Sequence, residues 1–237
     1  GVIAGLEVIQ TCQEAGITPV RPLSVAFFTD EEGARFSPDM LGSLVYAGGL
    51  GIEEALNIVG IDGKRVGDEL QNISYAGSTP CPGEVPHAFV EIHIEQGPVL
   101  EAEGFTLGAV TGVQGISWQE VTIAGQSNHA GTTPMSLRHD PTYVAAEIAV
   151  FLRQLSARFG EHQVCTVGKM DVFPNLINVV AARVTLTLDV RNTDETLLQQ
   201  AEQEISDFLK HIALAEGVTI TTKKLARFEP VVFDPRV

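Results

Sequence analysis

The order of hydrophobic patterns in the second half of the chain constrains the fold more than any other feature of the sequence. From residue 116 to residue 225, apolar side chains alternate or recur at helical spacing in the order strand, helix, strand, strand, helix, strand. The predicted strands are 116–124, 163–172, 182–190 and 218–225, and the predicted helices are 141–158 and 195–215. This β-α-β-β-α-β order is typical of a ferredoxin-like layer, which can form a small domain of its own.

Local signals support both long helices. Asp140 offers a side-chain cap, and Pro141 suits the first helical position because its missing N–H is not needed there. Thr193 or Asp194 can cap the second helix in the same way. We therefore expect sharp helix starts at both places.

The first half of the chain predicts an α/β unit. Residues 2–15 have helical spacing and end at Gly16, and shorter helical patterns lie around 41–47 and 52–59. The apolar run 23–29 predicts a strand buried on both faces, and residues 87–95 alternate in a way that predicts a second strand. The whole chain is thus expected to be α/β.

Charge and composition narrow the classes of function. Residues 1–111 carry 16 acidic and 4 basic side chains, whereas residues 112–237 carry 14 acidic and 11 basic ones. This asymmetry suggests two units. A net charge of −15 without a basic patch argues against a nucleic-acid partner. No apolar run approaches the ~20 residues of a membrane span and no secretion signal is recognisable, so we expect a cytoplasmic protein. Three widely spaced cysteines fit neither a disulfide framework nor a metal knuckle.

An acidic cluster follows the first predicted strand. Asp30, Glu31, Glu32 and Gly33 would lie at its carboxyl end, where ligands commonly bind in α/β sheets. Three neighbouring carboxylates resist joint burial unless a cation is present. The cluster is therefore either a solvated loop or part of a metal site.

A histidine in the second predicted strand is a second candidate for metal chemistry. Period-two alternation puts His93 on one face with Glu91 and Glu95, which could act as ligands or orient the imidazole. A lone histidine in a strand is also an ordinary structural residue. The two clusters together favour a metal site more than either does alone.

A polar loop and two strand-end residues complete the candidates. In the loop GQSNHAGTTP, His129 could donate to a developing oxyanion, or the loop could be a hydrophilic turn. Arg191, at the end of a predicted strand, could grip a carboxylate, or be a surface residue. Asn175 and Asn178 in FPNLINVV could equally be turn residues.

Together these motifs resemble one enzyme family. FTDEEGARF, PDMLGSLVYAGG, EIHIEQGPVL, TGVQGISWQ, GQSNHAGTTPM, PNLINVV and LDVRN occur in this order and are similar to those of the hydantoinase/carbamoylase family. That family comprises N-carbamoyl-L-amino-acid hydrolases, ureidopropionases and allantoate amidohydrolases, within a superfamily of zinc aminoacylases and exopeptidases. The resemblance covers essentially the whole chain, and HIEQG and NHAGTTPM are its most specific parts.

The resemblance implies roles for individual residues. Glu31 matches the general base, and Glu32 and His93 match ligands to two different metal ions. His129 matches a histidine that stabilises the tetrahedral intermediate in the site of a partner subunit. The substrate-binding matches are Gln96, Asn178 and Arg191.

It also implies a domain plan and cofactors. Residues 1–112 match part of a catalytic metal-binding domain, 113–228 a lid and dimerisation domain, and 229–237 a return linker. The cofactors would be two divalent metal ions, zinc first, with manganese, cobalt or nickel also able to use such ligands. An earlier histidine motif, a bridging aspartate and a last histidine ligand of the family are not among residues 1–237, so we expect a fragment of a longer enzyme.

The expected reaction is hydrolysis of an N-carbamoyl-L-amino acid to amino acid, ammonia and carbon dioxide. The expected partners are a small substrate with a carboxylate and a second copy bound through the lid. Two alternatives stay open: an allantoate amidohydrolase, aminoacylase or exopeptidase of the same superfamily, and a non-catalytic dimerisation and ligand-binding module.

Overall fold

The computed structural model describes all 237 residues and has a mixed α/β fold of two compact units, residues 1–106 and 107–237. The expected boundary lay a few residues later, at 112/113. None of the helices is long and apolar enough to span a bilayer.

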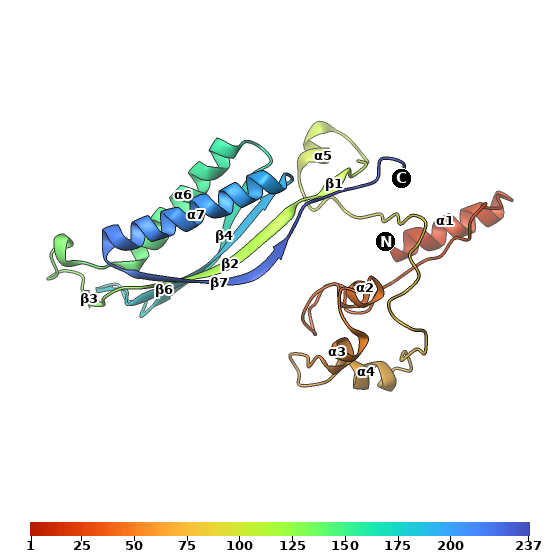
Figure 1. The fold of residues 1–237 in the computed structure, drawn as a ribbon, viewed down its shortest axis with the longest axis horizontal. Helices are drawn as coiled ribbons and strands as arrows, with labels where there is room; N and C mark the ends of the chain where they lie inside the picture. The colour runs from red at the N-terminus through yellow and green to blue at the C-terminus, as the bar shows by residue number, and fades with distance from the viewer. The chain divides into compact units, whose positions relative to one another are not determined.

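The second unit is built on a four-stranded antiparallel sheet with two long helices on one of its faces (Figure 1). The strands lie in the order β4-β6-β2-β7. The predicted order of strands and helices is confirmed, with boundaries within three residues of the expected ones. Its elements are β2 (Gly115–Ala124), α6 (Pro141–Phe159), β4 (Val164–Phe173), β6 (Arg183–Asn192), α7 (Glu195–Glu216) and β7 (Thr219–Phe228).

The core of this unit lies between the sheet and the helices. Along β6 every second residue from Val184 to Val190 is buried, and the residues between them face away from the helices. The helices contribute Ile148, Leu152 and Leu198, all of which are almost fully buried. Each such side chain contributes about 1.5–3 kcal/mol through burial, which explains why the alternating pattern fixes which face the helices cover.

Both predicted helix caps are present. The Asp140 carboxylate accepts hydrogen bonds from the backbone of Thr142 at 2.9 Å and Tyr143 at 3.4 Å, and Pro141 is the first residue of α6. Asp194 caps α7 by accepting from Leu197 at 2.9 Å. These bonds satisfy N–H groups that lack a partner at a helix start.

Two separate two-stranded ladders lie beyond the ends of the four-stranded sheet. At one end β3 (Asn128–His129) pairs with β5 (Val179–Val180), and at the other β1 (Gly112–Val113) pairs with β8 (Val231–Val232). In Figure 1 β3 and β1 lie at opposite ends of this unit. The segment expected to be a return linker, 229–237, thus includes a short paired strand.

The first unit contains short helices and extended chain. Its small core is formed by Phe36, Leu41, Val45, Ala55 and Val66. The predicted helix ends are close to the observed ones, and Gly16 has φ +65° after the first helix, as expected for a helix stop. The helices are α1 (Val2–Glu14), α2 (Leu41–Tyr46), α3 (Ile52–Asn57), α4 (Val66–Asn72) and α5 (Val99–Glu103).

The two strands predicted in this unit are wrong. Residues 23–29 and 87–95 have no strand assignment, because no neighbouring segment forms a ladder with them. Their apolar side chains are exposed, including Phe27, Val90 and Ile94. A strand is defined by its partner as much as by its own residues, and period-two alternation does not supply one.

Candidate functional site

The acidic cluster lies in a tight turn that packs against the start of α2. The carbonyl of Glu31 accepts from the N–H of Met40 at 2.7 Å, and the carbonyl of Thr29 accepts from Gly42 at 2.9 Å. A Cβ at Gly42 would lie 2.7 Å from the Thr29 nitrogen, so only glycine allows this approach. The turn leaves the side chains of Glu31 and Glu32 exposed.

Asp30, within the same turn, has two unusual features. Its φ is +53°, which is uncommon for a residue with a Cβ. Its Oδ2 atom is buried and has no hydrogen-bond partner. A buried carboxylate oxygen without a donor is costly, so this turn has an acceptor available for a cation or a donor.

His93 is exposed, and its ring orientation is set by the backbone. Nδ1 lies at hydrogen-bond distance from the carbonyl of Ile94. A carbonyl can only accept, so Nδ1 carries the proton and donates, and the lone pair of the neutral ring is on Nε2. A metal-binding histidine is typically held in this way, with one nitrogen bonded to a carbonyl and the other free for the ion.

The expected help of Glu95 to His93 is not observed. Glu95 instead caps the short helix α5, accepting from the backbone N–H of Val99 at 2.9 Å and of Leu100 at 3.1 Å. The alternation that put it on a common face with His93 required a strand, and this segment is not one.

Left-handed backbone marks three of the candidate segments. Gln96, a candidate substrate-binding residue, has φ +51°, Asp30 precedes Glu31 with φ +53°, and Asn175 lies near Asn178 with φ +51°. Such conformations cost free energy in residues other than glycine and cluster at functional sites. Met40 and Ser74 share the conformation without being candidates.

The candidate metal ligands of this chain form only part of a site for a divalent metal ion. Glu32 and His93 supply the oxygen and nitrogen that zinc and related ions accept, and the free Nε2 of His93 is suitable for such a bond. However, no three His, Cys, Asp or Glu side chains of the chain come together as a group that could hold a metal ion. A complete metal site would therefore need ligands in addition to these.

His129 lies in β3 and has the opposite ring arrangement to His93. Its Nδ1 accepts from the backbone N–H of Gly131 at 3.1 Å and of Thr132 at 3.3 Å. The proton of the neutral ring is therefore on Nε2, and this exposed imidazole is a hydrogen-bond donor toward solvent. Donation to a developing oxyanion requires this tautomer.

Asn178 lies beside His129. Its carbonyl accepts from the N–H of Ala130 at 2.9 Å, next to the pairing of β3 with β5. Its side chain is exposed, as is that of His129. The structure thus brings these two predicted residues together at one end of the sheet.

Arg191 lies near the other end of β6, on the face that the helices do not cover. Asp189 holds it by two parallel hydrogen bonds, at 2.9 Å to Nε and 2.8 Å to Nη2. These bonds raise the pKa of the Arg191 guanidinium above its ordinary value. The guanidinium also lies 5.8 Å from the centre of the Trp118 ring. The sequence analysis did not identify Asp189 or Trp118 as partners of Arg191. For Asp189 a signal was available, because residues two apart in a strand lie on the same face.

Within one chain, Arg191 and His129 lie at opposite ends of the sheet. Arg191 pairs with Ile116, whereas Arg183, at the other end of β6, pairs with Ala124, just before the loop that carries His129. Eight residues of strand span about 26 Å at about 3.3 Å each. A small substrate cannot touch both residues of one copy.

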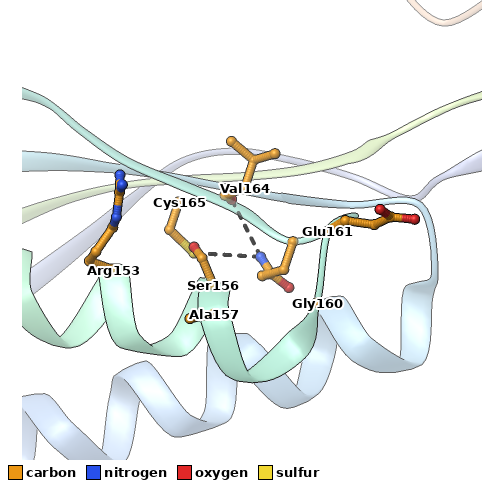
Figure 2. Close-up of a pocket in the computed structure, with 8 residues that line it drawn as sticks. Arg153, Ser156, Ala157, Gly160, Glu161, Val164 and Cys165 are labelled. Atoms are coloured by element: carbon orange, nitrogen blue, oxygen red, sulfur yellow. Dashed lines mark hydrogen bonds between the residues drawn. The ribbon is translucent and has the colours of Figure 1, made fainter. Parts of the chain in front are cut away.

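A separate cavity of about 470 Å³ lies between the end of α6 and the start of β4 (Figure 2). It is lined by Arg153, Ser156 and Cys165, among others, and by none of the predicted site residues. Gln163 also lines it, donating to the Val164 carbonyl and the Cys165 sulfur. Burial raises the pKa of the Cys165 thiol, so this sulfur is not an activated nucleophile.

Residues 1–235 match the family described as peptidase family M20/M25/M40, and the chain belongs to that family. Within it, the chain is a member of the hydantoinase/carbamoylase group. It is 40% identical to an N-carbamoyl-L-amino acid amidohydrolase of Geobacillus stearothermophilus over 98% of its length, and 35% identical to an allantoate amidohydrolase of Escherichia coli over 90%.

A solved structure agrees with these sequence relatives. A hydantoinase/carbamoylase family amidase of Burkholderia multivorans superposes with a TM-score of 0.95 and 42% identity, over 99% of this chain and 57% of the amidase. The chain likewise spans 57% of the Geobacillus protein and 52% of the Escherichia coli protein.

Proposed function

We propose that the protein is a metal-dependent amidohydrolase that cleaves a carbon–nitrogen bond of a ureido group. The proposed substrate is an N-carbamoyl-L-amino acid, which water would convert to the amino acid, ammonia and carbon dioxide. Relatives that carry this activity in their names support the substrate class. The reaction belongs to the intact protein, since residues 1–237 correspond to only part of these relatives.

The observation that carries the proposal is the opposite ring arrangement of the two candidate histidines. His93 directs a lone pair outward and suits a metal ion, whereas His129 directs an N–H outward and suits an oxyanion. Amide hydrolysis at a metal centre can use a group of each kind, one to bind the metal and one to stabilise the oxyanion.

Glu31 is proposed as the general base. Its carboxylate is exposed at the turn, from which it would take a proton from the attacking water and return it to the leaving nitrogen. Glu32 and His93 would each hold one of two divalent metal ions together with further ligands. When bound, such ions polarise a carbonyl and lower the pKa of water.

Substrate binding is proposed to involve two copies. The second unit would act as a ferredoxin-like lid and dimerisation domain, in which His129 and Asn178 of one copy reach a substrate bound by Arg191 of the other. Gln96 is proposed as a further substrate-binding residue. The ~26 Å between the two ends of the sheet supports this assignment. Exposed apolar side chains near His129, including Met135 and Ile177, suit contact with a second copy.

Allantoate is a second candidate substrate. It is also a ureido acid with a carboxylate, and relatives of 32–39% identity are named allantoate amidohydrolase or allantoate deiminase. The residues proposed for catalysis would serve either substrate, so the distinction lies in side chains that contact the rest of the molecule.

The test is ammonia release by the intact protein from N-carbamoyl-L-amino acids and from allantoate, with metal content measured by mass spectrometry. We expect Glu31→Gln to lower kcat by roughly a hundredfold or more, because no other group replaces the base. Glu53→Gln, an exposed glutamate on α3, is the matched control and should retain full activity. An intact protein that binds no metal and releases no ammonia from either substrate would refute the proposal.

A further inference from the structure

The side chain of Arg138 binds backbone carbonyls of the loop that carries His129. The chain leaves β3, passes through a 3-10 turn at Met135–Leu137, and returns at Arg138. The Arg138 guanidinium then donates back into the loop, to the Ala130 carbonyl at 2.5 Å and to the Thr133 carbonyl at 3.0 and 3.1 Å. A partly buried cation thus links the two ends of the segment 130–133.

This segment contains the donors that fix the His129 ring. The N–H groups of Gly131 and Thr132, which bind Nδ1, lie between the two carbonyls that Arg138 holds. The Thr133 N–H also donates to the His129 carbonyl at 3.2 Å. Moving either carbonyl would move the two donors and release the ring.

We propose that Arg138 is a positioning residue for His129, keeping the imidazole in the Nε2–H tautomer and aimed at the oxyanion. This inference rests on the proposed function, because it assigns a role within the same reaction. Arg138 itself is not in contact with the reacting atoms. It acts through the backbone of 130–133, where its planar guanidinium donates to two carbonyls three residues apart.

A purely structural role would give a different pattern of effects. Arg138 lies two residues before the Asp140 cap, so its loss could simply loosen the start of α6. In that case activity would fall through loss of folded protein, whether or not residue 129 is histidine. A positioning role predicts instead that the effect depends on the imidazole.

The experiment is a double-mutant cycle in the intact protein, with kcat and KM for ammonia release from an N-carbamoyl-L-amino acid. We expect Arg138→Met to lower kcat roughly ten- to a hundredfold with little change in KM, and Arg138→Lys to recover part of the loss. In a His129→Ala background the same substitution should have no further effect. Arg183→Met is the control, because the Arg183 guanidinium lies over the Phe173 ring and forms no side-chain hydrogen bond, so its loss should leave kcat unchanged.

A second readout does not depend on turnover. In protein labelled with ¹⁵N at histidine, the ring nitrogen shifts of His129 should report Nε2–H in the wild type and a mixture of tautomers in Arg138→Met. Gly131→Ala keeps Arg138 in place but adds a Cβ 3.3 Å from His129 Cε1, so it should displace the ring and lower kcat as well.

Two results would overturn the inference in distinguishable ways. If Arg138→Met lowers kcat equally with histidine or alanine at 129, or leaves the ring nitrogen shifts unchanged, Arg138 does not act through His129. If His129→Ala by itself leaves kcat unchanged, the catalytic role of His129 fails, and the positioning role fails with it.

Discussion

Asp189 fixes the orientation of the Arg191 guanidinium. Its carboxylate occupies Nε and Nη2 of Arg191, and the Trp118 ring lies against the guanidinium. The Nη1 edge is left for another acceptor. A long, flexible side chain is thereby held in one orientation, which would reduce the entropy cost of the proposed substrate binding.

We expect Asp189→Asn to raise KM for an N-carbamoyl-L-amino acid roughly tenfold with little change in kcat, because a charged hydrogen bond contributes about 1.5–3 kcal/mol. Steady-state kinetics of the variant would check this. Asp171→Asn is the control, since Asp171 pairs with Lys169 at 2.7 Å on the neighbouring strand and touches no candidate residue. A lower KM for Asp189→Asn would instead mean that Asp189 competes with the substrate for Arg191.

At the scale of elements, Arg227 joins β7 to α7 through two ion pairs. Arg227 lies 2.6 Å from Glu195 and 2.9 Å from Glu202, and its side chain is only 15% exposed. Hydrogen bonding by Arg227 lowers the pKa of Glu195 below its usual value of 4.5. The pair therefore stabilises the folded state above that pH, and the contribution is lost as the pH falls through the lowered pKa.

Removing this pair should change both stability and its pH dependence. We expect Arg227→Met to lower the free energy of unfolding by about 1–2 kcal/mol at pH 7, since both partners keep some contact with water. Glu195→Gln should give a flatter fall in stability than the wild type as the pH drops below 4.5. Denaturant unfolding at a series of pH values measures both; identical curves for wild type and Glu195→Gln would refute the assignment.

The elements also show how far sequence reasoning reaches. In the second unit, patterns predicted each long strand and helix because neighbours in the same unit pair with every strand, and buried positions such as Leu186 alternate with exposed ones. In the first unit the same patterns at 23–29 and 87–95 failed, since the partners that a strand needs are not encoded in its own alternation.

The sequence suggested the individual candidate residues of the site but not their positions relative to one another. His129 and Asn178 were expected near a substrate and do lie side by side. The separation of both from Arg191 depends on strand register, which motifs alone do not give. Arg138 and Asp189 were missed because their contacts are with backbone and with a neighbouring side chain rather than with a motif.

At the scale of the whole molecule, the proposed sharing of residues between copies predicts complementation. A hybrid dimer would combine one subunit that carries His129→Ala with one that carries Arg191→Met. One of its two sites would then have both residues intact. We expect each variant alone to be nearly inactive and an equal mixture, after subunit exchange, to regain about a quarter of wild-type activity.

The control for this experiment is a mixture of His129→Ala with the double variant His129→Ala/Arg191→Met, which should regain nothing. Ammonia release and the molecular mass in solution would be followed together. A dimeric mixture without recovered activity would mean that His129 of one copy and Arg191 of the other do not act in one site, and would refute the sharing.

The ladder between β2 and β6 also restricts how the protein can change over evolution. Ten residue pairs run without interruption from Gly115 to Ala124, with one face covered by helices. Adding or removing one residue within either strand would turn the outward side chains beyond that point inward unless a bulge absorbed it, whereas steps of two residues, about 6.6 Å, preserve the pattern. Selection for longer or shorter substrates is therefore expected to act through insertions and deletions in segments 125–134 and 174–178, while the length of the sheet stays constant.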